Sequence, residues 1–293
     1  MADLALLLLT LAWGTTFTLV KRALDGTSPA VFLTLRFAVA TLAVGAVWLA
    51  RRDRPSPGLW RHGALLGLAM LLGFVFQTVG LRHTTPARSG FITGLSVLIV
   101  PFLSHFLVRR RVPLAAWLGV ALAVAGLFAL TRPFGDGVSA SVRLGDALTA
   151  ACAVAYAFQI LWASEWSRRH PLSLLTLVQI SVALLGVAAM LPFEEVRLRP
   201  DADLWGTVAF TGIAMTAGAF FVMNWAQRHT TAVRAALIFS LEPAAAALFS
   251  HYYGGEPLLP SDWLGGALIV LGVAAGEVGG AIGARAADVG HAG

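Results

Sequence analysis

The feature that most constrains this chain is a stretch of sequence that occurs twice. Each copy opens with Arg-His-Thr-Thr, runs through an apolar segment to Ser-His, and ends at Trp-Leu-Gly. The first copy occupies residues 82–119 and the second residues 228–265. Further identities between the ungapped copies are Ile92 with Ile238, Leu95 with Leu241, and Gly126 with Gly272. About 17 of roughly 50 positions agree, more than a shared bias towards Leu, Ala and Gly would produce, so we interpret the two stretches as an internal duplication.

The composition indicates an integral membrane protein. Of the 293 residues, 58% are hydrophobic and only 12% are charged, and the mean hydropathy is +0.78. A soluble domain carries roughly 25% charged residues, so this chain lacks the polar surface to face water on all sides. The net charge is +6, and the arginines lie in short clusters between apolar runs. This pattern is typical of loops at anionic lipid headgroups. We therefore expect a lipid bilayer as a partner, and no nucleic acid.

Ten apolar runs are long enough as helices to cross a hydrocarbon core of about 30 Å. We predict them at residues 4–21, 30–50, 62–81, 86–108, 113–131, 145–164, 171–191, 204–227, 232–252 and 261–280. The longest connection, about 132–144, separates a first unit, 1–131, from a second unit, 145–280. Five spans per unit is an odd number, so the second unit must enter the membrane from the opposite side. The predicted fold is an all-α integral membrane protein with ten transmembrane helices in two inverted five-helix repeats.

Lysine and arginine are unevenly divided between the two sides of the membrane. With the N-terminus inside, the inner loops carry about twelve such charges and the outer loops about eight, which predicts that both termini are cytoplasmic. The first run contains Trp13 and ends at Lys21-Arg22, so we expect a retained first helix in preference to a cleavable signal peptide. These features predict a multi-pass protein of a bacterial-type inner membrane.

The fourth and ninth spans each contain an interior proline, Pro101 in one and Pro243 in the other. Thr85 and Thr231 can cap these two helices at their first turn. An interior proline removes a backbone hydrogen bond and leaves a carbonyl free, which a bilayer tolerates only where a neighbour or cavity water satisfies it. We predict a hinge or a polar point on a cavity wall at Pro101 and Pro243, with a packing kink as the alternative.

Glu242 is the most informative single residue. It lies roughly 15 Å along the ninth span, near mid-membrane, where a carboxylate in contact with lipid is costly. It should face the interior, as a proton-coupling or substrate-contact site or as a structural carboxylate at a broken helix. Its counterpart in the first copy is Ser96. Arg36, about 10 Å deep in the second span, either snorkels or pairs, or recognises a ligand carboxylate.

Polar and aromatic side chains within the spans predict a cavity. An isolated amide usually joins two helices, but amides occur in four different spans, which favours a polar cavity. Trp13 and Tyr156 occupy similar places in the first helix of each unit, which an inverted repeat brings towards a central axis. The predicted substrate-binding residues are Trp13, Phe17, Phe74, Gln77, Ser96, Tyr156, Gln159, Asn224 and Glu242.

Motifs of catalysis are absent from the sequence. It has no HExxH, no Gly-rich phosphate-binding loop and no GxSxG. The lone Cys152 can form neither an intrachain disulfide nor a zinc cluster. His83 and His105 lie roughly 30 Å apart by helical rise, and His229 and His251 repeat this spacing. We expect no catalytic residues, no metal, no cofactor and no enzymatic activity.

Several short motifs in the two copies match one known repeat. In the second copy they are Arg234-Ala235-Ala236-Leu237, Leu241-Glu242-Pro243, Gly255-Glu256-Pro257-Leu258 and Trp263-Leu264-Gly265-Gly266-Ala267-Leu268-Ile269. In the first half they are Ala12-Trp13-Gly14, Trp117-Leu118-Gly119-Val120-Ala121-Leu122 and Gly126. With these residues the chain resembles a member of the drug/metabolite transporter superfamily with two EamA repeats. The first copy departs from the pattern at Arg110-Arg111 and at Val97.

The resemblance implies a carrier with a central cavity that works by alternating access, with helices one, three, four, six, eight and nine around the cavity and five and ten at the periphery. Such carriers export amino acids and other metabolites, or carry sugar phosphates and nucleotide-sugars. A sugar-phosphate carrier would want several intramembrane cations, and only Arg36 is available. We expect a small-molecule exporter of amphipathic metabolites, most of all amino acids including aromatic ones, with proton coupling left open. The alternatives are a drug or other metabolite exporter, and a non-transporting protein such as a scramblase or scaffold.

Overall fold

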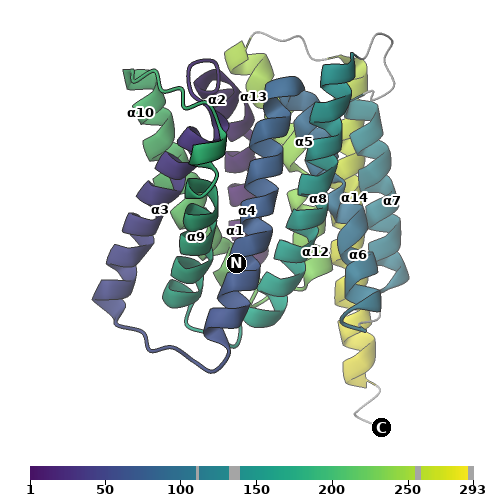
Figure 1. Cartoon of the computed structure of the whole chain (residues 1–293). Helices are drawn as coiled ribbons and strands as arrows, with labels where there is room; N and C mark the ends of the chain where they lie inside the picture. The colour runs from purple at the N-terminus through teal and green to yellow at the C-terminus, as the bar shows by residue number, and fades with distance from the viewer. Residues whose placement is uncertain (110–111, 132–138, 255–258, 290–293) are drawn as a thin grey trace.

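The structure is a computed structural model that describes residues 1–109, 112–131, 139–254 and 259–289. Outside the described residues lie Arg110-Arg111, residues 132–138 of the connection between the units, and residues 255–258 of the second repeat motif. The regular elements among the described residues are all helical, and the helices stand side by side in one bundle (Figure 1).

Ten segments of the described chain have the apolarity of membrane helices. Eight are long and apolar enough to cross a membrane by length and composition, and two shorter apolar helices, Leu114–Ala129 and Pro260–Ala275, take the fifth and tenth places. The prediction of an all-α integral membrane protein with ten transmembrane helices is confirmed. The agreement has a simple cause, because an apolar stretch of about 20 residues in lipid must satisfy its backbone polar groups internally, and a helix does so.

The helices in chain order are α1 (Ala2–Gly14), α2 (Thr16–Ala23), α3 (Pro29–Arg51), α4 (Leu59–His83), α5 (Pro86–Gly94), α6 (Ser96–Phe106), α7 (Leu114–Thr131), α8 (Ala140–Trp166), α9 (Leu172–Ala188), the short η1 (Leu191–Phe193), α10 (Ala202–Ala209), the π-helix η2 (Phe210–Gly218), α11 (Ala219–Ala226), α12 (Ala232–Phe239), α13 (Glu242–Gly254) and α14 (Pro260–Val289). The first span is α1 with α2, the fourth α5 with α6, the eighth α10 to α11, and the ninth α12 with α13.

The fourth and ninth spans are interrupted at equivalent positions of the duplicated sequence. The amide of Leu95 donates to the carbonyl of Ile92 at 3.2 Å, and the amide of Leu241 donates to the carbonyl of Ile238 at 3.1 Å. Each bond spans three residues, as in a 3₁₀-helix, so the backbone tightens there before a new helix begins. The same backbone device therefore occurs in both units.

The two prolines stand in different relations to these interruptions. Pro243 is the second residue of α13, in the first turn, where its missing N–H is one that no helical carbonyl would receive. Pro101 lies inside α6, and the helix continues through it. The first interruption thus lies at Leu95, before Pro101, and does not coincide with a proline. The hinge roles of Pro101 and Pro243 stay predictions.

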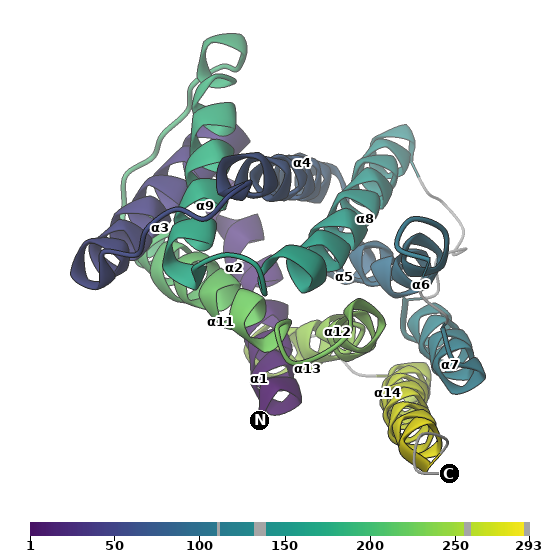
Figure 2. The same cartoon turned by 90° about the horizontal axis from the view of Figure 1, so that it is seen from below.

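Helices α7 and α14, the fifth and tenth spans, pack against each other at one edge of the bundle (Figures 1 and 2). A methyl group on Gly126 would lie 2.5 Å from the carbonyl oxygen of Gly265, and one on Gly272 would lie 2.6 Å from that of Gly119. Gly126 is equivalent to Gly272 in the duplication, and Gly119 to Gly265. Two antiparallel helices that exchange the same contact are related by a two-fold axis, as inverted repeats require.

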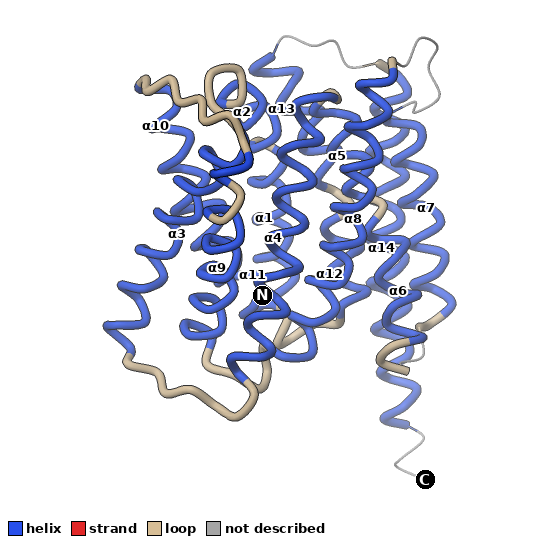
Figure 3. Tube along the Cα trace, viewed as in Figure 1, coloured by secondary structure: helices blue, strands red, loops and turns tan. Residues whose placement is uncertain are grey.

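The loops gather at the two ends of the bundle (Figure 3). At the end where α4 begins, His170 joins the two units: its Nδ1 lies 2.6 Å from Ser56 Oγ, and its Nε2 lies 2.7 Å from His62 Nδ1. Arg228 donates to the carbonyl of His170. Burial lowers the pKa of His170 below its usual range, and the nearby His62 and Arg169 lower it further. We call this the His170 end.

Polar contacts also join the units at the opposite end. Arg88 of α5 forms an ion pair with Asp146 of α8, and Thr84 donates to the same carboxylate at 2.8 Å. Within the first unit, Lys21 of α2 donates to the carbonyl of Thr84 at 3.2 Å. We call this the Arg88 end. A cavity lies in the bundle between these two sets of contacts.

Candidate functional site

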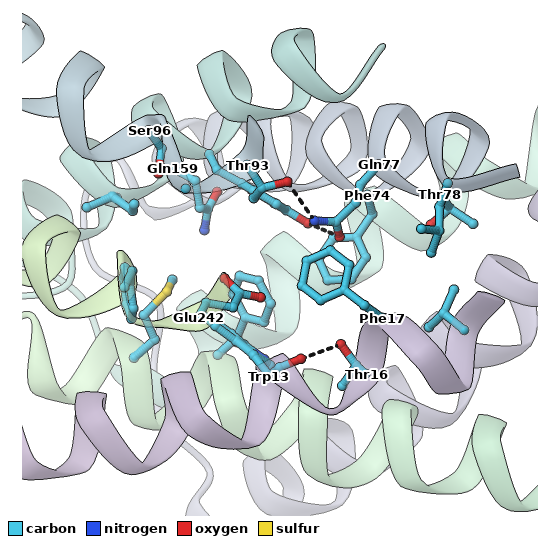
Figure 4. A pocket seen from close by; sticks show the side chains of 18 of the residues that line it. Trp13, Thr16, Phe17, Phe74, Gln77, Thr78, Thr93, Ser96, Gln159 and Glu242 are labelled. Atoms are coloured by element: carbon cyan, nitrogen blue, oxygen red, sulfur yellow. Dashed lines mark hydrogen bonds between the residues drawn. The ribbon is translucent and has the colours of Figure 1, made fainter. Parts of the chain in front are cut away.

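The cavity is lined by helices of both units and has a volume of about 70 Å³. Figure 4 shows its side chains. The lining residues are Trp13, Thr16, Phe17, Val20, Arg36, Phe74, Gln77, Thr78, Leu81, Thr93, Gly94, Ser96, Tyr156, Gln159, Ile160, Phe220, Met223, Phe239 and Glu242. They come from the first, third, fourth, sixth, eighth and ninth spans, as expected, and in addition from α3, which contributes Arg36.

Most of the residues predicted to bind substrate meet in this one cavity. Those that line it are Trp13, Phe17, Phe74, Gln77, Ser96, Tyr156, Gln159 and Glu242. Asn224 is the exception: it is fully buried, and its Nδ2 donates to Thr176 Oγ1 of α9 at 3.0 Å. It follows Met223, which does face the cavity. One step along a helix turns the side chain by about 100°, so the amide points towards the neighbouring helix.

Four lining residues that were not predicted, Thr16, Val20, Thr78 and Leu81, lie at helical spacing from predicted ones. The wall contributed by α1 and α2 consists of Trp13, Thr16, Phe17 and Val20, and the wall contributed by α4 consists of Phe74, Gln77, Thr78 and Leu81. Both sets follow the same i, i+3, i+4, i+7 pattern, which places side chains on one face of a helix. This periodicity, started from the predicted residues Trp13 and Phe74, would have identified their neighbours.

The π-helix η2 holds Trp13 through a hydrogen bond to its indole ring. Its indole N–H donates to the carbonyl of Met215 at 3.1 Å, and its ring centroid lies 5.8 Å from that of Phe220 and 5.6 Å from that of Phe239. A π-helix bonds residues five apart, is rare, and frequently occurs at functional sites. The indole is therefore fixed at the edge of an aromatic cluster that borders the cavity.

Tyr156 anchors a polar chain across three helices. Its hydroxyl donates to Gln77 Oε1 at 3.4 Å, and Gln77 Nε2 donates to Thr93 Oγ1 at 3.2 Å. The ring of Tyr156 lies directly against Gly73 of α4, where a Cβ atom would overlap it. Only a glycine at position 73 leaves room for the ring in this place. The chain links α8, α4 and α5 and presents polar atoms to the cavity.

Arg36 is buried, and the interpretation that it snorkels to the surface is wrong. Only 4% of the residue is exposed, its Nε donates to Thr216 Oγ1 at 2.8 Å, and its Cζ lies 4.6 Å from the centroid of the Phe74 ring. The cation–π contact and the Thr216 bond hold the guanidinium against the cavity wall. The packing of α3 against the π-helix η2 keeps it there, with Gly212 in close contact with the backbone of Arg36.

Glu242 and Ser96 open the second helix of their spans. Each is the first residue after an interruption, Ser96 in α6 and Glu242 in α13. The first amides of a helix point along its axis without helical partners and favour a negative charge, so the start of α13 suits a carboxylate. In Figure 4 the Glu242 carboxylate points into the cavity.

Gln159 contributes an amide to the wall. Its Nε2 donates to Gln179 Oε1 at 3.3 Å, whereas its Oε1 has no hydrogen-bond partner in the structure. Gln179 itself is buried behind the wall. An unmet buried acceptor is uncommon, so Gln159 is a polar group that a ligand or water can satisfy. The part of the chain that the structure describes has no cluster of three His, Cys, Asp or Glu side chains that could hold a metal ion.

The duplicated organisation of the chain has a counterpart among known proteins. A family model described as the EamA-like transporter family matches residues 1–132 and again residues 143–275. The chain belongs to the EamA-like transporter family. It is therefore a multi-pass membrane transporter, and the match of two EamA segments in one chain agrees with the two-fold relation seen between α7 and α14.

Relatives of this EamA-like transporter extend over most of its length. An uncharacterized transporter of Archaeoglobus fulgidus is 33% identical over 93% of this chain and 84% of its own. The uncharacterized transporter YwfM of Bacillus subtilis is 25% identical over 89% and 88%, and the uncharacterized inner membrane transporter YedA of Escherichia coli is 22% identical over 92% and 88%. A crystal structure with 23% identity has a TM-score of 0.76 over 94% of this chain and 95% of that chain, which supports the fold.

Proposed function

We propose that this transporter exports small amphipathic metabolites, first of all amino acids including aromatic ones, by alternating access through the cavity between its two units. The observation that carries the proposal is the wall of that cavity. It combines aromatic faces such as Trp13, Phe74 and Phe220 with a few hydrogen-bonding groups such as Gln77 and Tyr156. Sites for small molecules are mostly apolar with a few placed polar groups, which suits an amphipathic solute.

Alternating access requires that each end of the bundle can open while the other stays closed. The His170 end and the Arg88 end are both joined by polar contacts between units. Water can replace such hydrogen bonds at small net cost, whereas separating packed apolar surfaces would expose them. The ends are therefore suited to opening in turn, and the interruptions at Leu95 and Leu241 lie beside the cavity.

The test is transport by the purified chain in proteoliposomes. Vesicles loaded with a radiolabelled amino-acid mixture should lose label faster than protein-free vesicles, and an imposed pH gradient should reveal whether protons are coupled. Phenylalanine or another aromatic amino acid is expected to give the largest effect. If no amino acid moves faster than in protein-free vesicles, the proposal is overturned.

Export of drugs is the second candidate, favoured by the aromatic cluster of Trp13, Phe220 and Phe239. A lipophilic aromatic cation that moves while amino acids do not would establish it. A scramblase or scaffold would leave all solutes unmoved, and a fluorescent-lipid quenching assay on the same vesicles distinguishes the scramblase from the scaffold.

We also propose the inner membrane as the location, with both termini cytoplasmic. The chain has one cysteine, Cys152, which is buried, so single introduced cysteines report on topology. Arg54, in the loop between α3 and α4, and Glu195, in the segment before α10, are exposed. These two connections lie at opposite ends of the bundle (Figure 1). An impermeant maleimide applied to intact cells should label Glu195→Cys and should label Arg54→Cys only after permeabilisation. The reverse pattern would invert the proposed topology.

A further inference from the structure

Two opposite charges line the cavity and do not pair with each other. Arg36 lies on α3 and Glu242 at the start of α13, and both border the same space. Neither forms an ion pair with any residue that the structure describes. Charged groups within a membrane protein are costly unless they find a partner. Two separated charges that face one cavity can therefore bind a ligand that carries an anionic group for Arg36 and a cationic group for Glu242.

The guanidinium of Arg36 is oriented so that part of it remains available. The Thr216 hydroxyl donates to the carbonyl of Thr211 at 2.8 Å, so its oxygen accepts from Arg36 Nε, at 2.8 Å. Phe74 covers one face of the group. These contacts use Nε and a face, and no hydrogen bond of the two terminal nitrogens is present among the described residues. Two parallel N–H groups on such an edge match the two oxygens of a carboxylate.

Glu242 supplies the opposite end. It is the first residue of α13, so the helix start favours its negative charge. The side chains that α8 contributes to the same cavity wall are Tyr156, Gln159 and Ile160, and none of them is a cation. A carboxylate without a cationic partner suits an ammonium group of the ligand, and Trp13 and Phe239 lie on the neighbouring wall, where an apolar side chain can contact them.

We propose that Arg36 binds the carboxylate, and Glu242 the ammonium group, of an amino-acid zwitterion whose apolar or aromatic side chain lies among the aromatic rings of the cavity; this rests on the proposed export of amino acids. Among the lining residues that the structure describes, Arg36 is the one cation and Glu242 the one anion. The site is thus matched to a net-neutral ligand that carries both charges. A dianion such as a phosphate ester would leave Glu242 opposed to it.

The experiment compares three ligands that share one aromatic ring and differ in charge. L-Phenylalanine has both groups, phenethylamine lacks the carboxylate, and 3-phenylpropionate lacks the ammonium. Their affinities are measured on the purified full chain by competition against radiolabelled L-phenylalanine and by direct binding of each labelled ligand. For the wild-type chain, L-phenylalanine should bind about 10- to 100-fold more tightly than either analogue, since each lost charge-assisted hydrogen bond has about that effect.

The variants then assign the two ends. Arg36→Gln should remove the advantage of L-phenylalanine over phenethylamine and leave phenethylamine binding unchanged, and Glu242→Gln should remove the advantage over 3-phenylpropionate. Arg36→Lys keeps the charge without the planar fork and should restore only part of the preference. Arg54→Gln and Glu195→Gln, which change exposed loop charges, should match the wild type. Thr216→Val, at the positioning residue, should shift the preference in the same direction as Arg36→Gln and by less.

The outcomes separate this inference from the proposed function. If the wild-type chain transports L-phenylalanine and Arg36→Gln retains the wild-type ligand ranking, or loses affinity equally for all three ligands, the assignment of Arg36 is overturned while export stands. The same holds for Glu242→Gln and its ranking. If the wild-type chain neither binds nor transports any amino acid, the proposed function is overturned and this inference with it.

Discussion

The fourth and ninth spans share one backbone arrangement, a helix, an interruption and a second helix, and they differ in the side chain that follows the interruption. Both begin with a threonine, Thr85 or Thr231, whose side chain accepts from an amide three residues on at 3.3 Å. Both tighten at the equivalent leucine before a second helix starts. The residue that follows is Ser96 in one and Glu242 in the other. The backbone geometry was conserved between copies, and the charge was placed in one copy alone.

The two interruptions also lie against each other. A Cβ atom on Gly94, at the end of α5, would come within 3.2 Å of Pro243 Cγ, at the start of α13. The proline occurs at one of the two interruptions, so it cannot be the common cause of both. A break that forms without proline in one copy and with it in the other is a property of the shared packing, and side-chain chemistry was then free to diverge.

The largest effect is expected when the charge of Glu242, which distinguishes the ninth span from the fourth, is removed. Glu242→Gln should lower amino-acid flux roughly 10- to 100-fold, because the charge-assisted hydrogen bond between Glu242 and the ammonium group of the amino acid is lost. The substitution should also flatten the pH dependence of flux. Ser96→Ala, at the equivalent position, removes an uncharged hydroxyl and should lower flux by only about a few-fold. Initial rates in proteoliposomes across a pH series measure both. Equal effects of the two substitutions would show that the charge carries no special role.

The second prediction tests whether the equivalent glycines of the peripheral helices α7 and α14 contribute equally to stability. Gly126→Ala and Gly272→Ala should each lower the free energy of unfolding by about 1–3 kcal/mol, because the added methyl would meet a backbone carbonyl that cannot move aside cheaply. A methyl group on Gly266 would have no atom within 4 Å, so Gly266→Ala is the matched control and should be neutral or stabilising. Thermal unfolding in detergent micelles compares them. Markedly unequal costs at positions 126 and 272 would argue against the two-fold relation.

A smaller effect is expected where the first helices of the two units face the cavity. Trp13→Ala and Tyr156→Ala should change the preference between phenylalanine and a smaller amino acid by a few-fold, since truncation of an aromatic wall favours different side-chain sizes. Trp60 and Tyr252 are 63% and 76% exposed, so the corresponding alanine variants serve as controls. Competition profiles in reconstituted vesicles give the readout, and profiles identical to those of the controls would remove the two residues from the site.

The smallest effect is expected at the His170 end, where His62 of the first unit contacts His170 of the second. The pKa of His170 is lowered, first by burial and then by His62 and Arg169, so the unfolded chain binds a proton at higher pH than the folded chain. The free energy of unfolding should therefore fall as the pH drops below about 6.5, and the loss should be complete below the lowered folded-state pKa. His170→Asn should reduce this acid sensitivity by about 1 kcal/mol or less, whereas His105→Asn, an exposed site, should leave it unchanged. A variant with full acid sensitivity would exclude His170 as its source.

The sequence by itself determined the ten spans, their grouping in two units and the inverted relation between the units. These properties are local or countable: a run of apolar residues either is or is not long enough to cross a bilayer, and an odd number of spans per repeat inverts the second copy. The duplication also identified the equivalent positions, such as Gly126 and Gly272, whose contact the structure then revealed.

Only the tertiary structure decided which face of each helix looks inward. In a soluble protein, the polar face of a helix marks the solvent side, but lipid tails are as apolar as a protein core, so that signal is weak in a membrane helix. Asn224 and Arg36 illustrate the consequence. Both are polar residues within spans, yet one amide bonds to a neighbouring helix and lies outside the cavity, whereas the arginine turns into it. Their orientation follows from contacts with α9 and the π-helix, residues more than 40 positions away in the chain, which no local pattern contains.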